Sequence, residues 1–334
     1  MRVARCPSRH TQSLWGRGAD STILVGMVQQ QVDGLAIGTA PEPQQPEALS
    51  LALAESPPDV RLPQVAATLA SARRGRIGLD GLIAARRGER LVGAAWACLM
   101  PGRTALVSPP HIEAGEPEAT LARLRDALAA YLESSGVRLG QVVLTERDGP
   151  TARRLAQDGY SHAAELLYMI CPADALPAEQ PAGELTFERY DPSQTERMAQ
   201  IIEHTYHETR DVPALNGVRD MADVLEGYRS TGDSADAHWF FVQHHREDVG
   251  CLLLADHPTD DQCELVYMGV MSPLRGRKWG LAITRFGQWQ ARRMNRPRMI
   301  LAVDAANKPA VASYVAAEFV ICDRRSVFLR VFSA

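Results

Sequence analysis

A short basic loop stands between an apolar segment and a helix-like segment in the last third of the chain. The apolar segment ends near Met271, and the helix-like pattern begins at Leu281. The loop between them contains Arg275, Gly276, Arg277, Lys278, Trp279 and Gly280. Backbone N–H groups at a helix N-terminus bind anions with the help of the helix dipole. The loop is therefore predicted to bind phosphate groups.

The charged residues around this loop are all positive. Between Leu265 and Val303 there is no Asp or Glu but there are eight Lys or Arg, in a chain whose formal net charge is −4. This excess favours a polyanionic ligand, although a solvated basic helix face has the same composition. Nucleic acid is a further alternative, but no RNA- or DNA-binding motif is present and aromatic residues make up only 6%. No nucleic-acid partner is predicted.

A pair of histidines is the other arrangement that could do chemistry. His204 and His207 are three residues apart on a predicted helix, and Glu208 follows them. Metal sites need further ligands at defined spacing, and no companion cluster has it. No metal site is predicted.

The elements that must position these residues form a repeated pattern. A length of 334 residues favours two domains. The stretches from Leu144 to Tyr160 and from Val303 to Phe319 have equal length, and both read as strand, helix, strand. We therefore expect a duplication. The predicted order is β-α-α-β-β-β-α-β-α-β, an α/β fold in which helices pack on a mixed sheet.

Composition sets the predicted boundaries. Residues 1–48 lack a packing face and are expected to form a disordered or loosely attached arm. Residues 173–183 have linker composition. The two predicted domains are then residues 49–172 and residues 184–334.

The cellular compartment follows from the cysteines and the apolar runs. The six cysteines are scattered without a CxxC pair, which predicts reduced thiols in a cytoplasmic protein. No apolar run approaches the roughly 18 residues that cross a bilayer, so no membrane partner is predicted. The N-terminus lacks the pattern of a signal peptide.

The basic loop resembles the signature of the GNAT superfamily of N-acetyltransferases. That signature is Arg or Gln, two residues, Gly, one residue, then Gly or Ala. Arg275 and Gly280 match its ends, and Lys278 replaces its central glycine. Lys278 has a Cβ where glycine has none. The loop is expected to keep its function if the backbone of Lys278 is right-handed, with the side chain pointing outward.

A second segment carries the same resemblance. The family's Asn-x-x-Ala-x-x-x-Tyr-x-x-x-Gly-Phe is matched by Asn307, Ala310, Tyr314 and Phe319, with Glu318 in place of the glycine. The resemblance covers residues 184–334 well and residues 50–172 weakly. It implies two tandem GNAT-like acyl-CoA N-acyltransferase domains.

The resemblance implies that acetyl-CoA is the cosubstrate. Its pyrophosphate would lie on the basic loop, and its pantetheine arm would lie along the preceding strand. The implied cofactor-binding residues are Met268, Gly269, Val270, Arg275, Gly276, Arg277, Lys278, Trp279, Gly280 and Asn307. Asn307 is also expected to cap the following helix.

The resemblance also implies direct attack by a primary amine in a ternary complex. The amine must lose a proton and the leaving thiolate must gain one. Tyr314 would be the acid that protonates the thiolate. Glu264, or a water that it holds, would be the base.

The acceptor site of this family is built largely from the segment between its first two strands. From Glu188 to Asp236 the chain has eleven Asp or Glu against five Arg and no Lys. This composition suits a cationic amine such as a polyamine, an aminoglycoside or a lysine side chain, although a solvated helix pair is equally acidic. Glu208 and Asp211 are the candidate substrate-binding acids.

The first half lacks these features. Leu155 stands where Tyr314 does, and Glu113, Glu116 and Glu118 would repel a pyrophosphate. It is predicted to be a degenerate GNAT-like domain that is structural or lines the acceptor site. A non-catalytic acyl-CoA sensor or scaffold, and a FemX-like aminoacyl transferase, remain alternatives for the whole chain. The sequence does not predict an oligomeric state.

Overall fold

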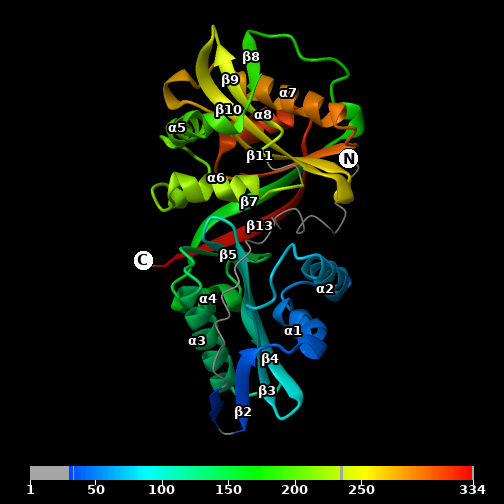
Figure 1. Ribbon diagram of the computed structural model, residues 1–334, viewed down its shortest axis with the longest axis vertical. Coiled ribbons are helices and arrows are strands. Elements are labelled where there is room, and N and C mark those ends of the chain that lie inside the picture. The colour runs from blue at the N-terminus through cyan, green and yellow to red at the C-terminus, as the bar shows by residue number, and fades with distance from the viewer. Residues whose placement is uncertain (1–29, 33, 234–235, 333–334) are drawn as a thin grey trace. The chain divides into compact units, whose positions relative to one another are not determined.

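The computed structural model describes residues 30–32, 34–233 and 236–332 of the chain (Figure 1). The chain divides into two compact units. One unit holds Ala163–Arg325, and the other holds the described residues up to His162 together with those from Ser326 onward. We refer to them as unit 1 and unit 2.

Unit 1 is a mixed sheet with helices on both faces. Its strand order is β13-β7-β12-β11-β10-β9-β8. The strands are β7 Ser161–Pro172, β8 Leu185–Arg189, β9 Trp239–His244, β10 Glu247–His257, β11 Gln262–Val270, β12 Arg298–Asp304 and β13 Val320–Val331. The helices are α5 Thr195–Tyr206, α6 Met221–Arg229, α7 Trp279–Arg293 and α8 Lys308–Ala316.

Unit 2 repeats this architecture. Its strand order is β1-β2-β3-β4-β5-β6-β13. The strands of its own half are β1 Gln30–Val32, β2 Leu35–Thr39, β3 Leu82–Arg87, β4 Arg90–Met100, β5 Thr104–Ile112 and β6 Leu139–Leu144. The helices are α1 Gln45–Ala52, α2 Pro58–Arg73, α3 Glu118–Ser134 and α4 Pro150–Gln157. In the part of the chain described, no helix combines the length and apolar character needed to cross a membrane.

The element order agrees with the predicted duplication. From β8 to β13, and again from β2 to β7, the chain runs β-α-α-β-β-β-α-β-α-β. The matched positions Gly159 and Glu318 both have left-handed backbones, with φ of 79° and 67°. Two stretches of different sequence thus end their last helix with the same turn.

The predicted domain boundaries differ from the structure, because each half places its last strand in the other unit. In unit 1, β7 pairs antiparallel with β12 from Leu166 to Pro172. In unit 2, β13 pairs antiparallel with β6 from Ser326 to Val331. The boundaries between the units therefore fall inside β7 and β13, and not at the linker.

The predicted arm of residues 1–48 also needs correction. Its last part forms β2, the 3-10 turn Glu42–Gln44 and the start of α1. Leu35, Ile37 and Leu49 are buried in the unit 2 core. β2 and α1 are the first elements of the duplicated pattern, so this segment belongs to the domain. Residues 1–29 lie outside the described part of the chain.

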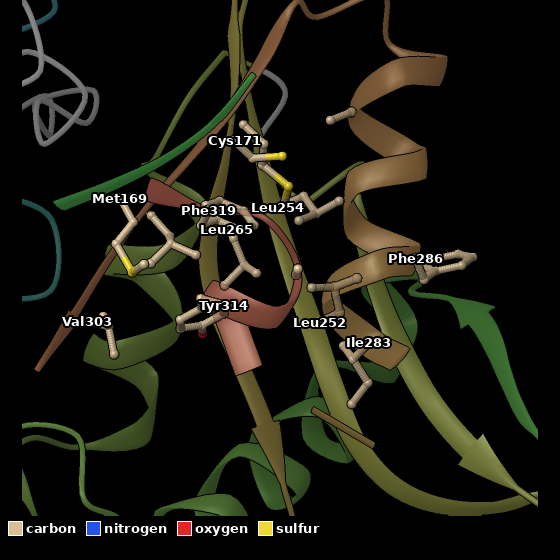
Figure 2. Close-up of a cluster of buried hydrophobic side chains, with 14 of the residues drawn as sticks. Met169, Cys171, Leu252, Leu254, Leu265, Ile283, Phe286, Val303, Tyr314 and Phe319 are labelled. Atoms are coloured by element: carbon tan, nitrogen blue, oxygen red, sulfur yellow. The ribbon is translucent and has the colours of Figure 1, made fainter. Parts of the chain in front are cut away.

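Separate apolar clusters pack the helices against the two faces of the unit 1 sheet. On one face, Ile283 and Phe286 of α7 and Tyr314 of α8 pack with Leu252 and Leu265 of the strands (Figure 2). On the other face, α5 and α6 pack on β9 and β10 through Met198, Ile202, Leu225, Trp239 and Phe241. The helices that carry the basic loop and Tyr314 are thereby fixed on the same face.

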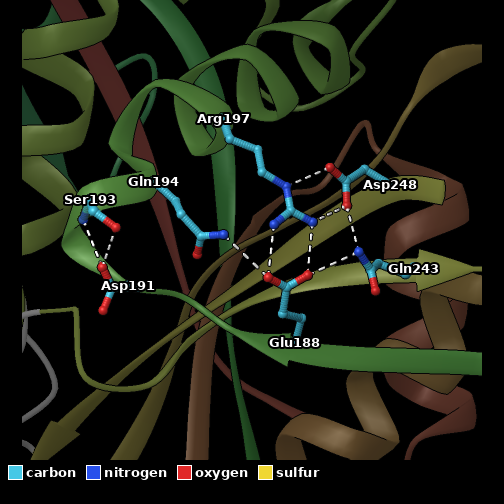
Figure 3. A network of polar contacts seen from close by, with 7 residues as sticks. All are labelled: Glu188, Asp191, Ser193, Gln194, Arg197, Gln243 and Asp248. Atoms are coloured by element: carbon cyan, nitrogen blue, oxygen red, sulfur yellow. Dashed lines mark hydrogen bonds and ion pairs between the residues drawn. The ribbon is translucent and has the colours of Figure 1, made fainter. Parts of the chain in front are cut away.

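A charged network ties α5 to the edge of the sheet (Figure 3). The Arg197 guanidinium donates to both carboxylate oxygens of Glu188 on β8, at 2.8 and 2.9 Å. It also donates to Asp248 on β10, at 2.6 and 2.8 Å. Because the bonds are bidentate, they fix the direction of α5 as well as its distance from the strands.

Candidate active site

A cleft opens where β11 and β12 diverge. These parallel strands pair only at Cys263 with Met299 and at Glu264 with Ile300. Beyond Glu264, β11 continues to Val270 with β10 on its other side. The resulting cleft has a volume of about 940 Å³, and residues of α5, β11, α7, β12 and α8 line it. An extended ligand could therefore reach the backbone edge of β11 that β12 leaves unpaired.

The basic loop forms one wall of this cleft. The residues Arg275, Gly276, Arg277, Lys278, Trp279 and Gly280 all line it. α7 begins at Trp279, so the first N–H groups of the helix lack intrahelical acceptors. The loop thus places a helix N-terminus at the cleft. This is the arrangement on which the prediction of phosphate binding depends.

The conformation of Lys278 is the opposite of the one expected. Its φ is 61° and its ψ is 14°, which is left-handed, and Gly276 two residues earlier has φ of 86°. Lys278 therefore adopts the conformation for which glycine is favoured, at a cost of roughly 1–2 kcal/mol. Left-handed residues in such loops turn successive N–H groups inward to form anion-binding concavities.

Arg275 connects the basic loop to β11 and to the end of α5 through hydrogen bonds. Its guanidinium donates to the carbonyl oxygens of Val270 at 3.0 Å, Glu208 at 3.0 Å and Thr205 at 2.7 Å. Thr205 belongs to the last turn of α5, where a cation is favourable. Arg275 thus fixes the loop to α5, and Arg277 and Lys278 are the exposed cations beside it.

Trp279 anchors the start of α7. Its indole is buried and donates to the Glu184 carboxylate at 2.5 Å. The Arg277 guanidinium lies over the same ring, 5.0 Å from its centre. The ring is a packing element, so the part of Trp279 that an anion at the helix start could contact is its backbone N–H.

Glycine is required at position 269 because α5 packs closely against β11 there, whether or not a ligand binds. A Cβ at this position would lie 2.6 Å from the Cβ of Thr205. The close approach of α5 to β11 therefore excludes any side chain here. Met268 and Val270, on either side, also line the cleft with their backbones on the open edge.

Asn307 and Tyr314 lie together on α8. The Asn307 side chain accepts from the Ala310 N–H at 3.4 Å, which confirms the predicted helix cap. Tyr314 lies seven residues later, on the same helix face, and both residues line the cleft. The Tyr314 ring is 6% exposed and packs edge-on against Phe319. Burial, followed by the charge of Asp211, raises the pKa of the Tyr314 phenol.

Asp211 enters the cleft from the loop between α5 and α6. Its carboxylate accepts from the Asp304 N–H at 3.0 Å and from the Asn307 side chain. Burial is the main cause that raises the pKa of Asp211, and the charge of Asp304 acts in the same direction. The Asp304 carboxylate in turn accepts from the Val212 N–H at 3.2 Å and the Ala306 N–H at 2.9 Å.

Sequence reasoning missed Asp304. It is 3% exposed at the end of β12 and holds the Asp211 loop in place. A signal was present, because Asp at the start of a turn often accepts from the N–H two residues later. The Ala306 bond is of that kind.

Glu208, the other predicted substrate-binding acid, has a local partner. Its carboxylate accepts from the Ser272 hydroxyl at 2.5 Å, and Ser272 precedes the basic loop. Glu208 lines the cleft, but it lies on the side of the basic loop. Its contacts join the α5 end to that loop.

Glu264 is placed differently from the expectation. Its carboxylate lies 2.8 Å from the Nε2 atom of His257, and it is not among the described residues that line the cleft. A bulge explains the placement. Tyr267 pairs with Leu253 but Leu265 pairs with Leu254, so Val266 is an extra residue. Glu264 lies before this bulge, where β11 and β12 are still paired.

The equivalent position in unit 2 lacks the same chemistry. Leu155 is buried in the core where unit 1 has Tyr314. At the start of α3, the Glu116 carboxylate accepts from the Thr120 hydroxyl at 2.7 Å and from Arg87 at 2.9 Å. The Glu116 carboxylate thus lies near the start of α3. Within the described residues, no group of three or more His, Cys, Asp or Glu could hold a metal ion.

Comparisons with known proteins place this geometry in a fold family. No family model matches the sequence, and no curated protein matches it. A GCN5-related N-acetyltransferase from Sphaerobacter thermophilus is similar, with a TM-score of 0.61, 15% identity and coverage of 90% of this chain and 97% of that one. A tandem GNAT protein from the clavulanic acid biosynthesis pathway is also similar, with a TM-score of 0.53, 16% identity and coverage of 90% and 99%. Since both likenesses extend over nearly the whole of each chain, this protein has the tandem GNAT fold.

Proposed function

We propose that unit 1 is an acetyl-CoA-dependent N-acetyltransferase that transfers the acetyl group to a primary amine. The observation that carries the proposal is the single cleft between β11 and β12. It brings together an unpaired strand edge, a helix N-terminus with exposed cations, and a buried tyrosine. Each of these features matches one part of acetyl-CoA.

The cosubstrate would bind in an extended form. The amides of its pantetheine arm would pair with the backbone of Met268 and Val270, as an added strand pairs with a sheet edge. The pyrophosphate would lie at the start of α7, beside Arg277 and Lys278. The thioester would then reach the deep part of the cleft, where Tyr314 lies.

The Tyr314 phenol is suited to assist the leaving group. Its raised pKa keeps it protonated at neutral pH, so it can donate a hydrogen bond to the sulfur as negative charge develops. The amine nitrogen attacks the thioester carbonyl, the C–S bond breaks, and the thiolate receives its proton from Tyr314. Direct attack is favoured because both substrates would share one cleft.

The acceptor is proposed to be a cationic amine. Glu208 and Asp211 are the two carboxylates among the described residues that line the cleft. One similar structure is described as the glucosamine N-acetyltransferase region of a fungal enzyme, with 11% identity and a TM-score of 0.55. An amino sugar therefore belongs in an acceptor panel together with a polyamine and a lysine peptide.

The test has two steps with the full-length protein. Acetyl-CoA binding is measured by isothermal titration calorimetry, and thiol release is then followed with spermidine, glucosamine and a lysine-containing peptide. Binding followed by amine-dependent thiol release supports the proposal. Binding without turnover on any of these amines would favour the sensor or scaffold, and absence of binding would reject the acyl-CoA site.

A further inference from the structure

We infer that Asp211 is the catalytic base that accepts the proton of the attacking amine, a role that the family resemblance implied for Glu264. The inference rests on the proposed acetyl transfer and names a residue for it. It starts from the place of Asp211 in the cleft, on the loop that leaves α5 and next to Asn307.

The partners of Asp211 hold its carboxylate without neutralising it. One oxygen accepts from the Asp304 N–H at 3.0 Å, and the Asn307 side chain supplies a second hydrogen bond. Both donors are neutral amides. These two neutral donors leave a lone pair of the carboxylate unused, and a base accepts its proton through such a lone pair.

The backbone around Asp211 is strained. Val212 has φ of 40° and ψ of 64°, and Glu208 has φ of 53°. A β-branched residue in the left-handed region is a rare outlier that the surrounding structure must enforce. Here the Val212 N–H bond to Asp304 enforces it and directs the preceding carboxylate toward the start of α8.

The same helix start orients the proposed acid. Asn307 caps α8 and contacts Asp211, and Tyr314 lies seven residues further on the same face. The charge of Asp211 acts on the Tyr314 phenol, so the two groups are within electrostatic reach. Asp211 and Tyr314 thus line the same cleft, within electrostatic reach of one another.

The two other acids predicted for the site, Glu208 and Glu264, have partners of their own. Glu208 accepts from Ser272 on the side of the phosphate-binding loop. Glu264 lies 2.8 Å from His257, and its side chain is 13% exposed. Of the described acids, Asp211 alone combines a place in the cleft with contact to α8.

The proton balance of the step is complete. The ammonium group of a cationic acceptor first loses a proton to solvent. The neutral amine nitrogen then forms a bond to the carbonyl carbon, loses a second proton to Asp211, and becomes the amide nitrogen. The C–S bond breaks, and the sulfur takes a proton from Tyr314. Solvent then removes the proton from Asp211 and returns one to Tyr314, so amine and acetyl-CoA yield amide and free CoA.

The titratable groups within electrostatic reach of Asp211 come from four elements. They are Tyr206 of α5, Tyr267 of β11, Asp304 of β12 and Tyr314 of α8. The tyrosines stay protonated at neutral pH because burial raises the pKa of each phenol. Asp211 is therefore the group expected to set the acidic limb of the rate profile.

The experiment compares Asp211→Asn, Asp211→Glu, Glu264→Gln and Glu203→Gln in the full-length protein. Glu203 is exposed on α5 and serves as the matched control. Each variant is tested for acetyl-CoA affinity by calorimetry and for thiol release with spermidine, glucosamine and the lysine peptide across pH. We expect Asp211→Asn to bind acetyl-CoA normally and to lose about 100-fold or more in kcat, together with the acidic limb. Asp211→Glu retains a carboxylate and should keep a shifted acidic limb, which tests the role even if the Asn variant fails to fold.

Each of the remaining outcomes contradicts either the role of Asp211 or the proposed function. Normal turnover in Asp211→Asn, or loss of the acidic limb in Glu264→Gln alone, overturns the role of Asp211 and leaves the proposed acetyl transfer intact. Loss of acetyl-CoA binding in Asp211→Asn, with the fold preserved, also overturns it, because a base is not needed for binding. Absence of amine-dependent thiol release in the unmodified protein rejects the proposed function and this role with it.

Discussion

Asp211 and Asp304 hold each other in place through backbone hydrogen bonds. The Asp304 N–H donates to the Asp211 carboxylate at 3.0 Å, and the Val212 N–H donates to the Asp304 carboxylate at 3.2 Å. The bonds connect the loop after α5 to the end of β12. The Asp304 carboxylate is thus kept close to Asp211 beside the cleft, where its charge adds to burial in raising the pKa of Asp211.

The first prediction concerns stability and pH. Because burial raises the pKa of Asp211 in the folded state, ionisation costs folding free energy at pH values above the pKa of the unfolded chain. The stabilising contribution of the protonated form is present at low pH and is lost as pH rises through the folded pKa. Asp211→Asn should therefore be at least as stable as the unmodified protein at pH 7. Any gain in its free energy of unfolding over the unmodified protein should be smaller at pH 3.

Thermal unfolding at both pH values measures this difference. Glu203→Gln is the control, because its exposed carboxylate has no comparable burial. A clear loss of stability in Asp211→Asn at pH 7, absent in the control, would show that the hydrogen bonds of the carboxylate outweigh the cost of burying its charge.

The second prediction concerns Tyr314→Phe. The ring is packed against Phe319, so removal of the hydroxyl alone should leave the fold intact. We expect kcat to fall by about 10-fold to 100-fold, because the leaving thiolate loses its hydrogen-bond donor. Acetyl-CoA affinity from calorimetry should change by less than about threefold. Equal turnover in the two proteins would remove Tyr314 from the mechanism.

The third prediction concerns the left-handed Lys278. Lys278→Gly should raise the free energy of unfolding by about 1 kcal/mol, because glycine adopts this conformation without strain. Its acetyl-CoA affinity should fall by no more than about fivefold, the effect of one exposed charge. Lys278→Ala is the matched control, since it removes the same charge but keeps a Cβ.

The two variants separate charge from conformation. Denaturant unfolding should show a gain for the glycine variant only, while calorimetry should show similar affinities for both. Acetyl-CoA binding that becomes much tighter in Lys278→Gly would instead show that the lysine side chain obstructs the phosphate site.

The order of elements and the place of the basic loop before a helix could be predicted from the sequence because they depend on local pattern. Apolar periodicity defines α7 and β12, and Asn307 precedes α8 at a cap position. The left-handed Lys278 could not be predicted, because lysine rarely adopts that conformation. It belongs to the turn that leads into α7.

The positions of Glu264 and of the exchanged strands depend on pairing that the sequence does not encode locally. One extra residue, Val266, changes which face of β11 each following side chain occupies. β7 and β13 both follow a short helix, as they would in a self-contained repeat. Which sheet each strand joins is decided by its partners, β12 and β6, far away in the sequence.

The most direct test of the account is to fill the cleft between the diverging strands. Ala302 on β12 lines the cleft and is exposed, so Ala302→Trp should block it without disturbing the core. Ala312 is exposed on α8 outside the described cleft lining, and Ala312→Trp is the matched control. Calorimetric titration with acetyl-CoA should show binding to the unmodified protein and to Ala312→Trp, and at least about 100-fold weaker binding to Ala302→Trp. Equal affinity in all three proteins would contradict the assignment of this cleft as the acetyl-CoA site.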